Sequence, residues 1–119
     1  MARLSIGIDL VQVSRIESSI TEFGERFLDR VFTAGELAYA RHKPESLAAR
    51  FAAKEAAKKA LSLDGIGWRD VEVIRTTTGA CTLALHGEAA RLAGSAELAV
   101  SLSHEADFAT AVVVAQVST

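Results

Sequence analysis

Cysteine, proline and aromatic residues are all scarce in this chain of 119 residues. It contains one cysteine, Cys81, and one proline, Pro44, and aromatic residues make up 6% of the sequence. A single cysteine excludes an intramolecular disulfide and a multi-cysteine metal site, and it is consistent with a reducing compartment. No two histidines stand at helical spacing, so a zinc site is not expected either.

The chain also lacks an excess of charge of one sign and a long apolar run. Its 13 basic and 15 acidic residues give a formal net charge of -2, which argues against general attraction to nucleic acid or to a membrane surface. No apolar stretch approaches the roughly 18 residues of a membrane span, and no signal-like segment opens the chain. We therefore expect a cytoplasmic protein in which any anion-binding site is local.

Length and hydrophobic content fit one small domain spanning residues 1–119. Half of the residues are hydrophobic, as a packed core requires, and domains commonly have roughly 100 to 150 residues. A chain this short exposes a large share of its surface. Apolar area that remains exposed after folding would therefore favour oligomerisation.

Two capping-box patterns predict helix starts. Ser14 is followed three residues later by Glu17, and Thr33 by Glu36; in each pair the two side chains can satisfy backbone N–H groups that a helix start leaves free. The second of these helices should end before Pro44, because the residue before a proline disfavours helical geometry.

Alternation of apolar and polar residues indicates strands. The first of them should have one buried face formed by Leu4, Ile6 and Ile8. A hairpin follows, with strands near residues 71–75 and 81–85 and a turn at 76–79. A short helix is predicted at 87–93, and two further strands at 98–102 and 108–117 with a polar turn at 103–107. One strand, then helices, then mostly strands predicts an α+β fold with a mainly antiparallel sheet packed on helices.

A long helix is predicted over residues 47–61, which are rich in alanine, lysine and arginine. Ser46 can cap it. Arg50, Lys54 and Lys58, spaced four residues apart, would form a basic stripe on this helix, with Glu55 and Lys59 on the neighbouring stripe. One interpretation is a solvated face, in which Glu55 and Lys59 form a weak surface pair. The other is a binding site, favoured by the small alanines beside Glu55, which let a ligand or another backbone approach.

Two further positions are candidates for chemistry. Asp9 directly follows an apolar strand, where a rigid element can hold a carboxylate in place, although an ordinary turn residue is the alternative. Spacing does not pair it with Glu55. Ser101, Ser103 and His104 near the end of a later strand offer hydrogen-bond donors to a phosphate, or simply form a polar turn.

Three motifs together resemble the holo-acyl carrier protein synthase family, the short class of 4'-phosphopantetheinyl transferases. They are Gly7-Ile8-Asp9-Leu10-Val11 followed by Arg15-Ile16, Arg50-Phe51-Ala52-Ala53-Lys54-Glu55-Ala56 followed by Lys59-Ala60-Leu61, and Ser101-Leu102-Ser103-His104. Their order and separation extend the resemblance over essentially the whole chain.

The resemblance implies an enzyme of fatty acid or polyketide biosynthesis. It implies Mg²⁺-dependent transfer of the 4'-phosphopantetheine group from coenzyme A to a serine of an apo acyl carrier protein, with release of 3',5'-ADP. It also implies an α+β fold and a homotrimer with active sites between subunits. A catalytically silent module that binds coenzyme A or a carrier protein is the alternative.

The resemblance also assigns roles to individual residues. Asp9 and Glu55 would be catalytic residues that ligate Mg²⁺, and Lys59 would stabilise charge on the transferring or leaving group. Three basic residues, Arg50, Lys54 and His104, would contact the nucleotide phosphates, and Arg50 would reach them across a subunit interface. Arg15 would contact the acidic carrier protein.

Overall fold

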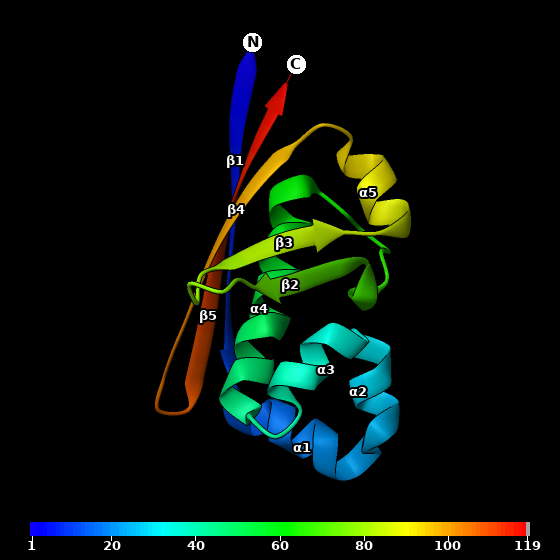
Figure 1. Ribbon diagram of the computed structural model, residues 1–119, viewed down its shortest axis with the longest axis vertical. Helices are drawn as coiled ribbons and strands as arrows, with labels where there is room; N and C mark the ends of the chain where they lie inside the picture. The colour runs from blue at the N-terminus through cyan, green and yellow to red at the C-terminus, as the bar shows by residue number, and fades with distance from the viewer. Residues whose placement is uncertain (119) are drawn as a thin grey trace.

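The computed structural model describes residues 1–118 (Figure 1). Five strands and five α-helices occur in this range, with one short 3₁₀ helix, η1 (Trp68–Asp70). Their order is β1 (Ala2–Gln12), α1 (Val13–Phe23), α2 (Glu25–Val31), α3 (Ala34–Ala40), α4 (Pro44–Leu61), β2 (Val71–Arg75), β3 (Cys81–Leu85), α5 (Gly87–Ala93), β4 (Glu97–Glu105) and β5 (Phe108–Ser118). The predicted α+β class and the predicted order of elements are confirmed.

All strand pairing is antiparallel. One sheet has the strand order β1-β5-β4, and β2 and β3 form a separate two-stranded sheet. Figure 1 shows α4 running along the larger sheet, with the β2–β3 hairpin crossing in front of α4 and α1, α2 and α3 gathered at one end. Strand β3 also contacts β4 of the larger sheet. Within residues 1–118, no helix combines the length and apolar content needed to cross a membrane.

Strand β1 faces α4 with its small residues, which reverses the predicted burial. Ser5 Oγ donates a hydrogen bond to the Ala60 carbonyl at 2.6 Å, and a Cβ on Gly7 would lie only 2.0 Å from the Ala56 carbonyl oxygen. Backbones this close leave no room for branched side chains between them. Four apolar side chains of β1 therefore point away from α4, and they are 63 to 72% exposed: Leu4, Ile6, Ile8 and Leu10. Val11, on the other face of the strand, is buried.

Helix α4 is the central element of the core. Its buried face is made of alanines, which allow the helix to lie close to both sheets: Ala48, Ala49, Ala52, Ala53, Ala56, Ala57 and Ala60. The helix begins at Pro44 rather than after Ser46. Proline is favoured in the first turn of a helix because its missing N–H would have no partner there.

The first helical segment starts differently from the prediction and contains a break. It is broken into α1 and α2 at Gly24, whose φ of 57° is costly for residues with a side chain. The Ser14–Glu17 capping box is wrong, because α1 begins at Val13 and has no side-chain hydrogen bond from its N-cap residue. The Thr33–Glu36 capping box at the start of α3 is confirmed.

Candidate active site

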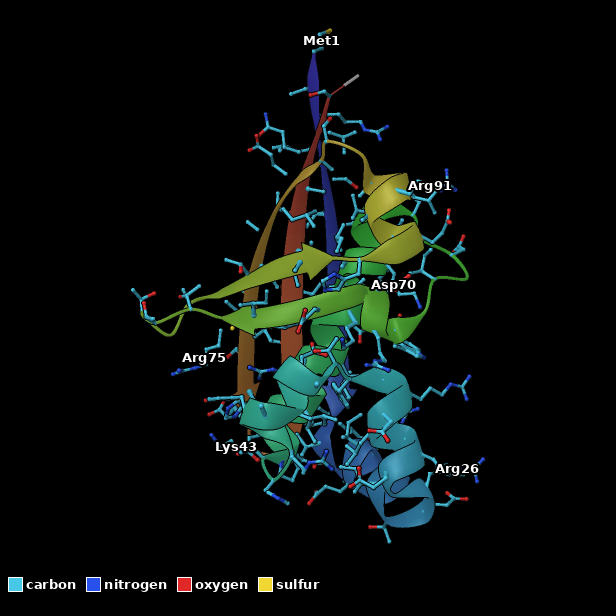
Figure 2. The ribbon with its side chains drawn as sticks, turned by 45° about the vertical axis from the view of Figure 1, so that its right-hand side comes forward. Met1, Arg26, Lys43, Asp70, Arg75 and Arg91 are labelled. Carbon is cyan, nitrogen blue, oxygen red and sulfur yellow. The ribbon has the colours of Figure 1, made fainter. Side chains whose placement is uncertain are left out.

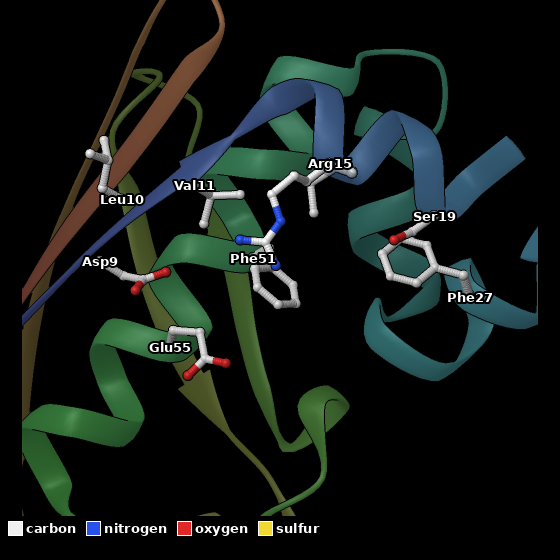
Figure 3. Close-up of a pocket in the computed structure, with 9 residues that line it drawn as sticks. Asp9, Leu10, Val11, Arg15, Ser19, Phe27, Phe51 and Glu55 are labelled. Atoms are coloured by element: carbon white, nitrogen blue, oxygen red, sulfur yellow. The ribbon is translucent and has the colours of Figure 1, made fainter. Parts of the chain in front are cut away.

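A pocket of about 330 Å³ lies where β1, α1, α2 and α4 meet. Figure 3 shows the carboxylates of Asp9 and Glu55 side by side at this place, with the Arg15 side chain extending from α1 toward Phe51. The structure thus brings together three residues that sequence spacing left separate. The full lining is Asp9, Leu10, Val11, Arg15, Ile16, Ser19, Phe27, Phe51 and Glu55.

Asp9 is held by strand pairing on one side and by close packing on the other. It pairs with Ala111 in the β1–β5 register, and Thr110 Oγ1 donates to the Asp9 carbonyl at 2.8 Å. Gly7, two residues earlier on the same face, lets β1 approach α4 next to Ala56, the neighbour of Glu55. The two carboxylates meet because of this close approach, and both side chains are partly buried.

Lys59 joins the same group one helical turn beyond Glu55. Its Nζ donates to Asp9 Oδ1 at 3.2 Å and to the Ile8 carbonyl at 2.9 Å. The lysine side chain is 55% exposed, whereas that of Asp9 is 19% exposed. A pair this exposed adds at most about 1 kcal/mol to stability, so the lysine can turn toward an anionic ligand at little cost.

The donor set in the pocket fits a hard divalent cation. Asp9 and Glu55 offer carboxylate oxygens, and no cluster of three or more histidine, cysteine, aspartate or glutamate side chains forms a metal cage within residues 1–118. Mg²⁺ is commonly bound by one or two carboxylates and completes its octahedron with water and substrate phosphates. The two residues present therefore suit Mg²⁺ in combination with a phosphate-bearing substrate.

Lys54 does not belong to this pocket, and its assignment to nucleotide phosphates is wrong. Its side chain is fully buried, and its Nζ donates to Glu36 Oε1 at 2.7 Å and to the carbonyls of Trp68 and Val71 at 3.2 and 2.5 Å. Burial lowers the pKa of Lys54, and the charge of Glu36 opposes that shift. The ammonium has no surface left for a ligand, because this side of α4 faces the core rather than solvent.

Arg50 is also buried, but it belongs to a group of cations around one aromatic ring. Its guanidinium carbon lies 4.9 Å from the centre of the Tyr39 ring, Lys43 Nζ lies 3.8 Å from it and the Arg75 guanidinium carbon lies 5.0 Å from it. Arg50 is 4% exposed, and its Nε has no hydrogen-bond partner within the described chain. We call Tyr39, Lys43, Arg50 and Arg75 the cation cluster.

Of the cation cluster, the sequence indicated only Arg50 as a candidate; Tyr39, Lys43 and Arg75 were missed. Figure 2 shows Lys43 and Arg75 on the same side of the molecule, although 32 positions separate their numbers. None of its three cations forms an ion pair with a carboxylate in residues 1–118. No local pattern signals the cluster, because the β2–β3 hairpin has to fold over α4 before Arg75 reaches Tyr39.

His104 lies near the pocket but does not line it. It is exposed in the last part of β4. The polar segment 103–105, predicted to be part of a turn, continues the strand, and the turn is confined to Ala106 and Asp107. A neighbouring hollow is lined by His104, Ser103 and Thr110, among others, and shares Leu10 with the pocket. Within one chain, His104 and the Asp9–Glu55 pair therefore occupy adjacent sites.

Comparisons with known proteins agree with one another. Residues 5–113 match the family model described as the 4'-phosphopantetheinyl transferase superfamily. The holo-[acyl-carrier-protein] synthase of Moorella thermoacetica is 48% identical over 124 residues, covering 97% of this chain and 95% of the relative, and that of Solibacter usitatus is 46% identical over 109 residues, covering 84% and 87%.

Solved structures show the same similarity in three dimensions. A Helicobacter pylori holo-[acyl-carrier-protein] synthase in complex with coenzyme A has a TM-score of 0.84 at 34% identity, covering 92% of this chain and 98% of that chain. A Chronobacterium ammoniagenes complex with coenzyme A has a TM-score of 0.87 at 33% identity, covering 98% and 99%. The predicted family resemblance is confirmed.

Proposed function

The chain belongs to the 4'-phosphopantetheinyl transferase superfamily, and we propose that it transfers the 4'-phosphopantetheine group from coenzyme A to a serine of an apo acyl carrier protein. The observation that carries this proposal is the pocket in which Asp9, Glu55 and Arg15 meet, with Lys59 hydrogen-bonded to Asp9. Similar structures contain coenzyme A. The group transferred is therefore a phosphate-bearing arm, for which this pocket has suitable side chains.

Asp9 and Glu55 are the residues that would hold Mg²⁺. The ion, when bound, neutralises charge on the coenzyme A pyrophosphate and polarises the phosphoryl group under attack. The support from this chain is the pair of partly buried carboxylates held on two rigid elements, β1 and α4. Their own placement does not require a ligand, because Gly7 and the paired strand β5 already set it.

The reaction is a displacement at phosphorus. The serine oxygen of the carrier protein forms a bond to the β-phosphate of coenzyme A, the bond from that phosphorus to the bridging oxygen breaks, and 3',5'-ADP leaves with that oxygen. The serine proton goes either to Glu55 directly or to a water in the pocket. Lys59 stabilises charge on the transferring or leaving group, and the pocket otherwise acts by positioning the reactants.

The cation cluster and His104 are the proposed contacts for the nucleotide phosphates of coenzyme A. Support comes from the three cations at Tyr39, which have no carboxylate partner in the described chain. The cluster is separate from the pocket within one chain, so it would serve the active site of a neighbouring subunit.

A homotrimer with active sites between subunits is the proposed assembly. The support is the exposed apolar row on β1, formed by Leu4, Ile6, Ile8 and Leu10. Exposed apolar rows of this kind mark protein interfaces. Leu10 belongs to this row and also lines the pocket, so a subunit packed on the row would reach the edge of the active site.

Arg15 is the proposed contact for the acidic carrier protein. It is exposed at the start of α1 and lines the pocket with both carboxylates. A cation at this place would attract an acidic partner and fix its orientation with the serine toward the pocket. The activity would serve fatty acid or polyketide biosynthesis in the cytoplasm, a setting supported by the single cysteine.

Intact-mass spectrometry of the carrier protein tests this function. Purified chain, Mg²⁺ and coenzyme A are incubated with apo carrier proteins of fatty acid and polyketide synthesis. The expected result is a carrier mass increased by one phosphopantetheine arm, together with released 3',5'-ADP. Unchanged masses for all carriers would reject the transferase. Coenzyme A binding without transfer would then identify the silent binding module.

A further inference from the structure

The turn between β4 and β5 is hydrogen-bonded to the first turn of α1. The Asp107 carbonyl accepts a hydrogen bond from Val13 N at 2.8 Å. The Asp107 carboxylate accepts two more, at 2.9 Å each, from Ser14 N to Oδ1 and from Ser14 Oγ to Oδ2. Three bonds thus join segments that are 93 residues apart in the sequence.

Asp107 caps the start of α1 from a distant segment of the chain, in place of the residue that directly precedes the helix. The N-cap position of α1 is Gln12, which makes no side-chain hydrogen bond to the helix, and the first turn contains no acidic residue. The first N–H groups of a helix have no partner within it, and a negative charge near them is stabilised by the helix dipole. The Asp107 carboxylate supplies both the acceptor and the charge.

Asp107 contacts α1 at the point where the chain changes direction, because no linker precedes the helix. β1 ends at Gln12 and α1 begins at Val13, so the path changes within one peptide unit. Arg15 follows Ser14 directly and lines the pocket with Asp9 and Glu55. Whatever fixes the Ser14 amide therefore also fixes where the Arg15 side chain starts.

We propose that Asp107 is a positioning residue that holds the first turn of α1 so that Arg15 faces an acidic carrier protein at the Asp9–Glu55 pocket. This inference rests on the proposed function. Its consequence is that Asp107 affects carrier binding without touching the carrier. Coenzyme A binding, which depends on other residues, is unaffected.

Three substitutions and two readouts test the inference. Asp107→Ala is expected to raise both the KM for apo carrier and its Kd from fluorescence anisotropy about fivefold, the change that follows when the ~1 kcal/mol lost with a helix cap is expressed in carrier binding. The KM for coenzyme A should stay unchanged. Asp107→Asn should restore most of the loss, since asparagine is also a good cap. Asp64→Ala, the same change in an exposed turn, should match the wild type.

A double-mutant cycle with Arg15→Ala separates positioning from a general loss of stability. If Asp107 acts through Arg15, adding Asp107→Ala to Arg15→Ala produces no further change in carrier Kd, because the positioned group is already gone. If the double variant instead raised the carrier Kd by the product of the two single-variant effects, that result would overturn the inference. A lower melting temperature with unchanged carrier Kd, or an Arg15→Ala variant with unchanged carrier Kd, would do the same.

Measuring the carrier Kd separates this test from the test of the proposed function. Carrier binding is measured without turnover, so the cycle can succeed or fail whether or not the arm is transferred. If wild-type protein transfers the arm but the cycle shows no coupling, only the inference about Asp107 fails.

Discussion

Gly7 determines how closely Asp9 and Glu55 can approach each other. A Cβ at this position would lie 2.0 Å from the Ala56 carbonyl oxygen and 2.9 Å from the Ala60 nitrogen. Both neighbours are backbone atoms of α4, so no side-chain rotation can relieve the clash. The glycine is needed here for space, and its φ is not in the left-handed region.

Gly7→Ala is therefore expected to push β1 away from α4. We expect a loss of about 1 to 3 kcal/mol in the free energy of unfolding, as for other overpacked cores, and at least a tenfold loss of transfer rate because the carboxylates separate. Denaturant unfolding and the carrier-mass assay measure the two effects. Gly67→Ala is the control, since its Cβ would meet open space. A Gly7→Ala enzyme with wild-type rate would show that this spacing is not required.

The buried ion pair between Lys54 and Glu36 fixes helix α4 against α3 and β2. Glu36 Oε1 accepts from Lys54 Nζ at 2.7 Å and from Thr33 N at 2.9 Å, and its Oε2 accepts from Val73 N at 2.9 Å. Removing one member of a buried pair leaves the other charged and unpaired. The alanine face of α4 has few protruding side chains to set its position, so this ion pair contributes strongly to where α4 lies against α3 and β2.

Lys54→Met should lower the free energy of unfolding by about 3 to 5 kcal/mol, the usual cost of breaking a buried pair. Lys58→Met, one turn further on, should cost less than about 1 kcal/mol, because Lys58 only covers the Trp68 ring at a partly exposed site. Urea unfolding of both variants decides between these expectations. Equal losses would mean that the Lys54 pair has no special role in holding α4.

Elements whose signals are local could be predicted from the sequence, and those fixed by distant contacts could not. The Thr33–Glu36 box was correct because both partners lie within one turn. The start of α1 was missed because its cap, Asp107, comes from the β4–β5 turn. Lys54 was assigned to the wrong environment because four-residue spacing shows which residues share a face but not whether that face is buried.

The candidate site was only partly predictable for the same reason. Sequence spacing did not join Asp9 to Glu55, since their approach depends on β1 packing against α4. The family resemblance joined them, and the structure places both in one pocket. The cation cluster required the hairpin carrying Arg75 to fold over Tyr39, which no pattern in the sequence indicates.

At the scale of the whole molecule, the exposed row on β1 predicts the assembly. Ile6, near the middle of this row, is 67% exposed. Ile6→Glu would place a charge in the proposed subunit interface, so the variant should be a folded monomer, while the wild type should have three times the 12.6 kDa chain mass. Light scattering after gel filtration measures this, with Thr21→Glu on α1 as control. A monomeric wild type would contradict the trimer and the shared active site.

If the pocket formed by Asp9 and Glu55 carries out the transfer, a time course of carrier mass will separate the wild type from Glu55→Gln. Glutamine keeps the shape of the side chain but removes the charge. We predict full conversion of apo carrier by the wild type with Mg²⁺ and coenzyme A, and a rate at least a hundredfold lower for a folded Glu55→Gln variant, about the contribution of a catalytic acid–base group. Equal rates for the two proteins would contradict the account.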